Sequence, residues 1–296
     1  MLSRRSSLKR DEYLAAFILL LPAAIGLILF SFIPILQAFQ LSFYDAPLLS
    51  TQRTFIGLEN YATALGDSVF IRAILNTAVY AVDAVVLQVL VALALALLIR
   101  NHFPGIGFFR SAYFLPVVTS LVVVSTVWKI MYHTEDGLIN SVLRTASLPS
   151  LHWLTSPDVA LWSIVIMGVW KEVGFSMLVL LGGLHSIPRD YYEAAAIDGA
   201  TGGRSFWHIT LPLLRRALLF VVVLSTINAF KLFTPIYVMT DGGPADSTQT
   251  VVFYIFESVF RYFKMGYASA LSFLLLILVV IMAAIQFRLF RSDVEY

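Results

Sequence analysis

Long apolar runs separated by shorter polar segments dominate this sequence. A helix needs about 20 apolar residues to cross a hydrocarbon core of about 30 Å, and six runs reach that length. The predicted spans are residues 14–36, 73–99, 111–132, 158–184, 213–238 and 268–290. The runs lack the alternation of barrel strands, and only a helix pairs its backbone polar groups within one segment. We therefore predict an all-α integral membrane protein with six transmembrane helices, a tail at 1–13 and a second tail at 291–296.

Four prolines, Pro22, Pro34, Pro116 and Pro235, lie in or beside these spans. A proline inside a helix removes one backbone donor and can kink the helix. For Pro34 and Pro235, a position at a helix end is at least as good an interpretation.

The distribution of lysine and arginine orients the spans. Six spans place both termini on one side of the membrane. The segments on that side, 1–13, 100–110, 185–216 and 288–296, hold twelve Lys and Arg residues, whereas the longer loops on the other side hold five. Because an excess of these residues marks the cytoplasmic side, we predict that both termini are cytoplasmic.

Composition excludes several other classes of protein. Hydrophobic residues make up 59% of the chain and charged residues 13%, which leaves too few charges to cover a soluble core of this size. The chain has no cysteine, so it has no disulfides, thiolate metal ligands or cysteine nucleophiles. Its net charge of +2 gives no indication of a nucleic-acid partner.

Residues 186–212 separate the fourth and fifth spans, and this segment is much longer than the usual helix connection of two to eight residues. Pro188, together with Asp190 and Glu193, predicts a helix that begins after Ser186, with negative charge near the positive end of the helix dipole. The alanines that follow favour a helix and leave little bulk on its surface.

Gly199, Gly202 and Gly203 then predict a turn, and residues 204–210 predict a second short helix that ends at Pro212. A helix with small side chains, held between two spans, is suited to insertion into a groove of another protein. We therefore predict that the segment docks a cytoplasmic partner and passes its movement to both spans.

The same segment resembles a known motif. EAAAIDGA at 193–200, followed by I-x-L-P at 209–212, is similar to the EAA motif of permease subunits from binding-protein-dependent ABC importers. In that family the motif forms the coupling helix, which docks in a cleft of a cytoplasmic ATPase subunit. The residues to which the resemblance assigns this ATPase coupling are Glu193, Ala194, Ala195, Asp198, Gly199, Ala200, Ile209, Leu211 and Pro212.

Shorter stretches along nearly the whole chain resemble the carbohydrate branch of this family, the maltose and glycerol-phosphate type. They are FIGLENY (55–61), NT (76–77), LP (115–116), Trp128, GLIN (137–140), TDGGP (240–244), Thr250 and GYASALS (266–272). Each stretch is a weak signal alone, but their order and spacing make the match specific.

The resemblance implies a type I ABC importer permease fold in a bacterial or archaeal cytoplasmic membrane. It also implies four kinds of partner: a second homologous permease that completes a heterodimer, two ATPase subunits, an extracytoplasmic solute-binding protein and membrane lipid. The sequence lacks G-x-x-x-x-G-K-[ST], so we expect no cofactor on this chain. ATP and Mg²⁺ are expected on the partner ATPase subunits, which makes this chain a non-catalytic permease subunit.

Charged residues inside the spans indicate where a solute passes. Each costs about 2.5–3.5 kcal/mol near the bilayer centre, so such a residue is expected to face neighbouring helices or a water-filled path. A sugar-like solute needs hydrogen-bonding groups and an aromatic face. The residues predicted to line the passage are Glu172, Phe175, Ser225, Asn228 and Lys231, with Trp170, Phe230 and Tyr237 as further aromatic candidates.

Structural ion pairing is the alternative role for these charges. Asp83 in the second span could pair with Lys171 or with Lys231, in which case none of the three would contact a solute. Lys129, near the outer end of the third span, is expected to extend its ammonium group toward the interface.

An ion-coupled secondary transporter is the alternative function, because intramembrane charges also suit ion coupling. Such a transporter usually shows inverted repeats and broken helices at the midplane, and the sequence has no visible repeat. We therefore predict the permease subunit of an ATP-driven importer for a sugar or sugar-like solute. Disaccharides, oligosaccharides, monosaccharides, glycosylated polyols and glycerol phosphate all remain open as solutes.

Overall fold

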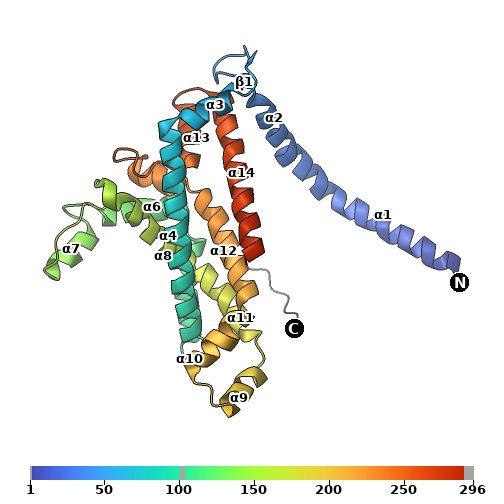
Figure 1. Ribbon diagram of the computed structural model, residues 1–296, viewed down its shortest axis with the longest axis vertical. Helices are drawn as coiled ribbons and strands as arrows, with labels where there is room; N and C mark the ends of the chain where they lie inside the picture. The colour runs from blue at the N-terminus through green and yellow to red at the C-terminus, as the bar shows by residue number, and fades with distance from the viewer. Residues whose placement is uncertain (1, 101–103, 290–296) are drawn as a thin grey trace. The chain divides into compact units, whose positions relative to one another are not determined.

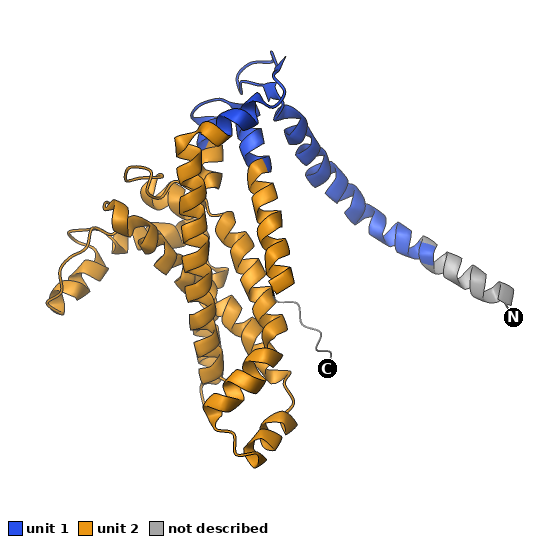
Figure 2. Cartoon of the chain, in the orientation of Figure 1, with its two compact units in different colours: residues 1–64, 257–273 blue, residues 65–256, 274–296 orange. Residues whose placement is uncertain are grey.

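The computed structural model describes residues 2–100 and 104–289, and the chain is mostly helical (Figure 1). It divides into two compact units (Figure 2). The first contains residues 1–64 and 257–273, and the second contains residues 65–256 and 274–296. The predicted C-terminal tail at 291–296 lies outside the described residues, as does residue 290.

In the first unit, one long helical run begins near the N-terminus. It comprises α1 (Leu2–Leu27), the π-helical turn η1 (Ile28–Phe32) and α2 (Ile33–Leu41). The wide turn η1 directly precedes the turn that contains Pro34. Proline lacks the N–H for the carbonyl four residues earlier and clashes with that carbonyl, and a π-turn relieves both problems. The part Ala15–Leu41 is 27 residues long, which is enough to span a membrane.

Two short strands follow this run, β1 (Tyr44–Asp45) and β2 (Thr54–Phe55), and they pair antiparallel. The Asn60 side chain, at the start of α3 (Glu59–Gly66), donates to the carbonyl oxygens of Ser42 at 2.8 Å and Tyr44 at 3.0 Å. Gly266 packs so closely that a Cβ there would lie 2.0 Å from the same Tyr44 oxygen. The FIGLENY and GYASALS stretches therefore hold one junction together, although more than 200 residues of chain separate them.

The second unit is built around α4 (Ser68–Leu98) and α8 (Pro157–His185), which pack side by side (Figure 1). Helix α12 (Arg215–Phe230) packs against both of them, and α5 (Ile106–Val118) packs against α8. Three glycines of α8 allow the close approach. A Cβ at Gly168 would lie 2.5 Å from the Tyr80 hydroxyl of α4, and Gly174 and Gly183 face α5 and α12 in the same way.

Among the described residues, four continuous helices are long and apolar enough to cross a membrane: Ala15–Leu41, Ser68–Leu98, Pro157–His185 and Met265–Leu289, the last being α14. They overlap the first, second, fourth and sixth predicted spans. Together with two bent helix pairs they give up to six spans. The predicted fold class, an all-α membrane protein, is confirmed.

The third predicted span, 111–132, is not one straight helix. Helix α5 ends at Val118, and α6 (Leu121–Met131) leaves it at an angle of 98°. Pro116 removes a backbone donor in the last turn of α5. Thr119 is extended and Ser120 has ψ 130°, so neither residue continues the helix.

The fifth predicted span, 213–238, is also interrupted. Its helix α12 stops at Phe230, and a π-helical turn η3 (Ile236–Thr240) follows separately. On its N-terminal side, the run Gly202–Leu213 meets α12 at 65°. This run consists of α10 (Gly202–Ser205), the π-helical turn η2 (Phe206–Thr210) and α11 (Leu211–Leu213). As before Pro34, a π-turn directly precedes the turn that contains its proline, Pro212.

The loop between η3 and α13 (Val251–Phe260) is tied to the start of α4. The Asn76 amide donates to the carbonyl oxygens of Asp246 at 2.8 Å and Gln249 at 3.0 Å. Thr77 accepts from the Val251 N–H at 3.0 Å, and Thr250 donates to the Leu232 carbonyl. The NT stretch therefore meets the segment that follows TDGGP, on both sides of Thr250.

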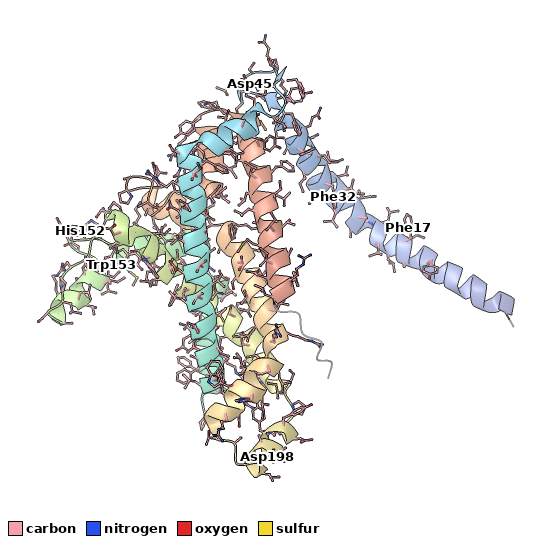
Figure 3. The ribbon with its side chains drawn as sticks, in the orientation of Figure 1. Phe17, Phe32, Asp45, His152, Trp153 and Asp198 are labelled. Carbon is pink, nitrogen blue, oxygen red and sulfur yellow. The ribbon has the colours of Figure 1, made fainter. Side chains whose placement is uncertain are left out.

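A single buried amide organises the loop around α7 (Leu138–Thr145). Asn140 donates to the Thr134 and Leu151 carbonyls, and its oxygen accepts from the Leu151 N–H and the Trp153 indole. All four of its hydrogen-bonding positions are therefore filled, as a fully buried amide requires. Figure 3 labels Trp153 in this region.

Candidate functional site

A cavity of about 320 Å³ lies in the second unit between α4, α8 and the C-terminal end of α12. Its wall combines apolar side chains with hydroxyl, amide and charged groups. The lining residues are Tyr80, Ala84, Gln88, Leu121, Met167, Gly168, Lys171, Glu172, Ser225, Asn228, Ala229, Lys231, Leu232, Phe233, Thr234 and Pro235. Four of the five residues predicted to line a passage are among them, and Phe175 is not.

Lys171 is almost completely buried, with 6% of its surface exposed. Its ammonium group donates to the carbonyl oxygens of Pro116 at 3.2 Å and Val117 at 3.0 Å, and lies 3.6 Å from the Glu172 carboxylate. Carbonyls in the last turn of a helix have no partner within that helix. Lys171 therefore caps α5 from the neighbouring helix α8, at the break that leads into α6.

Glu172, in contrast, keeps 38% of its side chain exposed at the cavity. Its nearest cation is Lys171, so the ion pair is buried at one end and open at the other. The predicted alternative, a pair between Asp83 and either lysine, is not among the ion pairs of the described residues.

Lys231 and Asn228 come together at the end of α12. Lys231 occupies the C-cap position, where the helix stops, and both side chains are exposed. Ser225 lies one turn earlier and is buried. Across the cavity, Gln88 of α4 donates to the Ser176 hydroxyl at 2.8 Å. Polar groups from three helices therefore surround the same space.

The aromatic residues of the wall are Tyr80 and Phe233, which were not among the predicted candidates. Phe233 stacks on Tyr237 with ring centroids 5.6 Å apart. Trp170 lies beside Trp128 at 5.6 Å, and Phe230 is buried in the core. The sequence signal for Phe233 was its position next to Lys231, and for Tyr80 its position one turn before Ala84 on the buried face of α4.

The predicted coupling segment begins with α9 (Asp190–Ile197), which has no buried residue. Gly199 follows it with φ +76°, a left-handed conformation that costs other residues about 1–2 kcal/mol. The Ala200 N–H bonds the Ala195 carbonyl at 2.8 Å, and the Gly199 N–H bonds the Ala196 carbonyl at 3.1 Å. These are the two hydrogen bonds of a Schellman cap, so Gly199 fixes the end of α9.

The tip of this segment presents side chains to the outside. Ile197 is 87% exposed and Trp207 is 64% exposed, and Figure 3 labels Asp198 at the turn. The predicted coupling residues differ in their exposure. Glu193, Ala194, Asp198, Gly199 and Pro212 are exposed, whereas Ala195, Ala200, Ile209 and Leu211 are partly buried.

The second half of the segment, residues 202–213, packs against the ends of the membrane-spanning helices. Leu211 packs against the core formed by α4, α8 and α12, and the Tyr192 hydroxyl lies 3.0 Å from the Thr210 hydroxyl. Packed side chains therefore connect the segment to α8 and α12.

Residues 70–292 match the family described as the binding-protein-dependent transport system inner membrane component. The match covers most of the chain, so the protein belongs to this family of multi-pass membrane permeases. The resemblance drawn from the EAA motif is thereby confirmed.

Relatives of similar length support this membership. The trehalose/maltose transport system permease protein MalF of Thermococcus litoralis is 32% identical and covers 97% of this chain and 98% of its own. The sulfoquinovosyl glycerol transport system permease protein SmoG of Agrobacterium fabrum is 34% identical over 95% of this chain and 92% of its own. A chain of a bacterial ABC transporter that imports the acidic polysaccharide alginate shares the fold, with a TM-score of 0.83, 23% identity, and coverage of 99% of this chain and 100% of that chain.

Replacing Gly199 with valine should uncouple ATP hydrolysis from the permease. A β-branched residue is strongly disfavoured at positive φ, so we expect the α9 cap to open. The strain of about 1–2 kcal/mol at residue 199 would destabilise the end of α9, the helix predicted to dock the ATPase. In an assembled, reconstituted transporter, we therefore expect stimulation of ATP hydrolysis by the loaded binding protein to fall by about tenfold.

Gly202→Val is the matched control. It adds the same bulk to the same loop, at a glycine that has no neighbour within 4 Å of its Cβ position and no positive φ. Normal stimulation in Gly202→Val with loss in Gly199→Val would establish the cap as the cause. Equal loss in both variants would instead show that added bulk blocks docking.

Proposed function

We propose that this chain forms one half of the translocation pathway of an ATP-driven importer for a sugar or sugar-like solute. The observation that carries the proposal is the cavity between α4, α8 and α12. It offers hydroxyl, amide and charged groups together with the rings of Tyr80 and Phe233. Solutes with many hydroxyl groups are bound by such a combination of polar contacts and aromatic faces.

The names of the relatives point to the same class of solute. Trehalose and maltose are disaccharides, and sulfoquinovosyl glycerol is a glycosylated polyol. The solute of this chain is proposed to belong to this range, with the choice made largely by the binding protein.

The proposed assembly contains a second homologous permease, two ATPase subunits and an extracytoplasmic binding protein. A second structure of the bacterial alginate transporter contains a periplasmic protein bound to an alginate pentasaccharide. This complex supports a binding protein as a partner of the present chain. This chain is proposed to be non-catalytic, with ATP and Mg²⁺ held by the ATPase subunits. Both termini are proposed to be cytoplasmic, which puts α9 on the side of the ATPases.

In the proposed mechanism, ATP-driven closure of the ATPases moves α9 and thereby turns the cavity from inward-facing to outward-facing. The binding protein then releases its solute into the cavity. The ATPases can act only through a difference in their interaction with these two states. The exposed tip at Ile197 and Asp198 and the packed connection through Leu211 support this route.

Asn228→Leu tests the proposed pathway. The variant removes an exposed amide from the cavity wall, and the loss of one hydrogen bond to the solute costs about 0.5–1.5 kcal/mol. We expect the solute concentration for half-maximal uptake into proteoliposomes to rise roughly 2- to 12-fold.

Thr126→Val is the control. Thr126 is an exposed residue of α6 whose hydroxyl bonds only its own helix, to the Val122 carbonyl, and it does not line the cavity. Unchanged uptake in Asn228→Leu would count against the pathway. Uptake that needs a proton or sodium gradient but no ATP would favour the ion-coupled alternative.

A further inference from the structure

A second cavity, of about 660 Å³, lies behind the predicted coupling helix, where α4 and α8 end and α9 begins. Its wall includes Arg100, Leu184, His185, Arg189, Tyr192 and Glu193. Glu193 is thus on the side of α9 that looks back toward the helix bundle. Nothing in the translocation mechanism uses this space.

Two guanidinium groups line the cavity, and neither forms an ion pair with a carboxylate of the described residues. The Arg100 guanidinium lies over the Tyr192 ring, 4.4 Å from the ring centroid. The ring covers one flat face of the guanidinium and leaves the N–H groups at its edge available for hydrogen bonds. Among residues 2–100 and 104–289, the side chains of Arg100 and Arg189 make no hydrogen bond or ion pair. Glu193 is the one carboxylate of the wall, and it lies beyond ion-pair distance of both.

The position of the cavity matches that of lipid headgroups. Arg100 follows the last residues of the membrane-spanning helix α4, and His185 is the last residue of α8. The His185 Nε2 lies 3.2 Å from the Arg100 carbonyl oxygen, so the two helix ends are held together at this level. Arginines at the cytoplasmic ends of spans lie where anionic headgroups are concentrated.

The shape of the wall favours an amphiphilic ligand over a free ion. The apolar residues Leu184, Ile187 and the exposed Ala196 belong to the wall beside the arginines. A guanidinium binds phosphate oxygens through two parallel N–H bonds, and the apolar wall accepts the glycerol and the first acyl carbons.

We propose that this cavity binds the phosphate headgroup of an anionic phospholipid of the cytoplasmic leaflet, with Arg100 and Arg189 as its ligands. The lipid would bridge the end of α4 to the start of α9, and would thereby hold the coupling helix against the bundle. The placement in the cytoplasmic leaflet rests on the proposed orientation, whereas binding itself does not.

The test uses the purified transporter in nanodiscs that contain either phosphatidylcholine alone or equal parts of phosphatidylcholine and phosphatidylglycerol. Native mass spectrometry measures the lipid that stays on this chain. Each arginine near a headgroup strengthens binding of an anionic lipid roughly fivefold, so we expect wild type to prefer phosphatidylglycerol by roughly 30-fold. The double variant R100Q/R189Q should lose this preference.

R204Q is the matched control. Arg204 is an exposed arginine of the same loop that does not line the cavity, so its removal should leave the preference unchanged. An equal loss in R204Q and R100Q/R189Q would overturn the site, because it would show a general effect of basic charge. Unchanged preference in R100Q/R189Q would overturn it as well.

A third arm separates the lipid from other anions. Wild type in phosphatidylcholine nanodiscs is heated with and without millimolar inorganic phosphate. We expect no change in melting temperature with phosphate and a rise with phosphatidylglycerol. Stabilisation by phosphate alone would show that the site binds a soluble anion instead of a lipid. Loss of ATPase subunits from R100Q/R189Q with the lipid preference intact would show that the arginines bind a side chain of the partner subunit instead. These readouts do not depend on solute uptake, so they stand or fall separately from the proposed transport function.

Discussion

Gly174→Ala should prevent α5 from packing on α8 and should remove most of the folded transporter from the membrane. A Cβ at this position would lie 1.9 Å from the Tyr113 carbonyl oxygen and 2.7 Å from its carbon. These atoms belong to the backbone of α5, so no side-chain rotation can relieve the clash. The two helices would have to move apart by more than 1 Å, given ordinary contact distances of about 3.5–4.0 Å.

The separation would also break a neighbouring interaction. Lys171 lies one turn before Gly174 on α8, and its carbonyl partners Pro116 and Val117 lie one turn after Tyr113 on α5. Overpacking costs about 1–3 kcal/mol by itself, and the lost cap adds to this cost. We expect the melting temperature in detergent to fall by several degrees and the membrane-inserted yield to fall markedly.

Gly182→Ala is the matched control, because it makes the same substitution on the same helix. No atom lies within 4 Å of the Cβ position of Gly182, and alanine favours the helix by about 1 kcal/mol over glycine. This variant should be as stable as wild type or more so. If Gly174→Ala behaved like Gly182→Ala, the close approach of α5 to α8 would be wrong.

Lys171→Met should also destabilise the protein, by about 1–3 kcal/mol. The variant keeps the length of the side chain but leaves the Val117 carbonyl without its donor and Glu172 without its nearest cation. The Pro116 carbonyl loses one donor and keeps the Thr119 N–H. The Val117 carbonyl loses its donor away from water, where an unpaired polar group is costly, whereas the partly exposed Glu172 carboxylate adds less to the loss. The shift is measured by thermal unfolding of the purified transporter, with solute uptake as a second readout.

Two further variants assign the cause. Lys129→Met removes an exposed lysine whose one hydrogen bond, to the Val238 carbonyl at 2.8 Å, is worth about 0.5–1.5 kcal/mol. Adding Glu172→Gln to Lys171→Met removes the unpaired carboxylate and should restore part of the stability. If Lys171→Met cost no more than Lys129→Met, Lys171 would not be a structural cap and its role in solute passage would need to be reconsidered.

The class of protein and its main segments could be predicted from the sequence. Span length is a property of one apolar run, so the helices Ala15–Leu41, Ser68–Leu98, Pro157–His185 and Met265–Leu289 overlap runs that are visible without any structure. The EAA motif is equally local, and it identified the family that residues 70–292 match.

The interior of the site was less predictable. Lys171 looked equally suited to an ion pair with Asp83 and to the lining of a passage, because its two carbonyl partners lie 54 and 55 residues away. The sequence signals for Tyr80 and Phe233 were too weak to single them out, since apolar and aromatic residues occur on every face of a membrane helix. The assignment of a face required the packing of α4, α8 and α12.

The sequence by itself therefore determined the all-helical membrane fold, the extent of most spans and the position of the segment with the coupling motif. These features depend on hydrophobicity, helix propensity and turn residues, which act over a few neighbouring positions. Only the tertiary structure decided the 98° break between α5 and α6, the capping role of Lys171 and the close contact at Gly174. These features depend on which helices pack together. A backbone carbonyl at a helix end needs a donor, and a glycine needs a neighbouring helix, and in both cases the partner comes from a segment that is distant in the sequence.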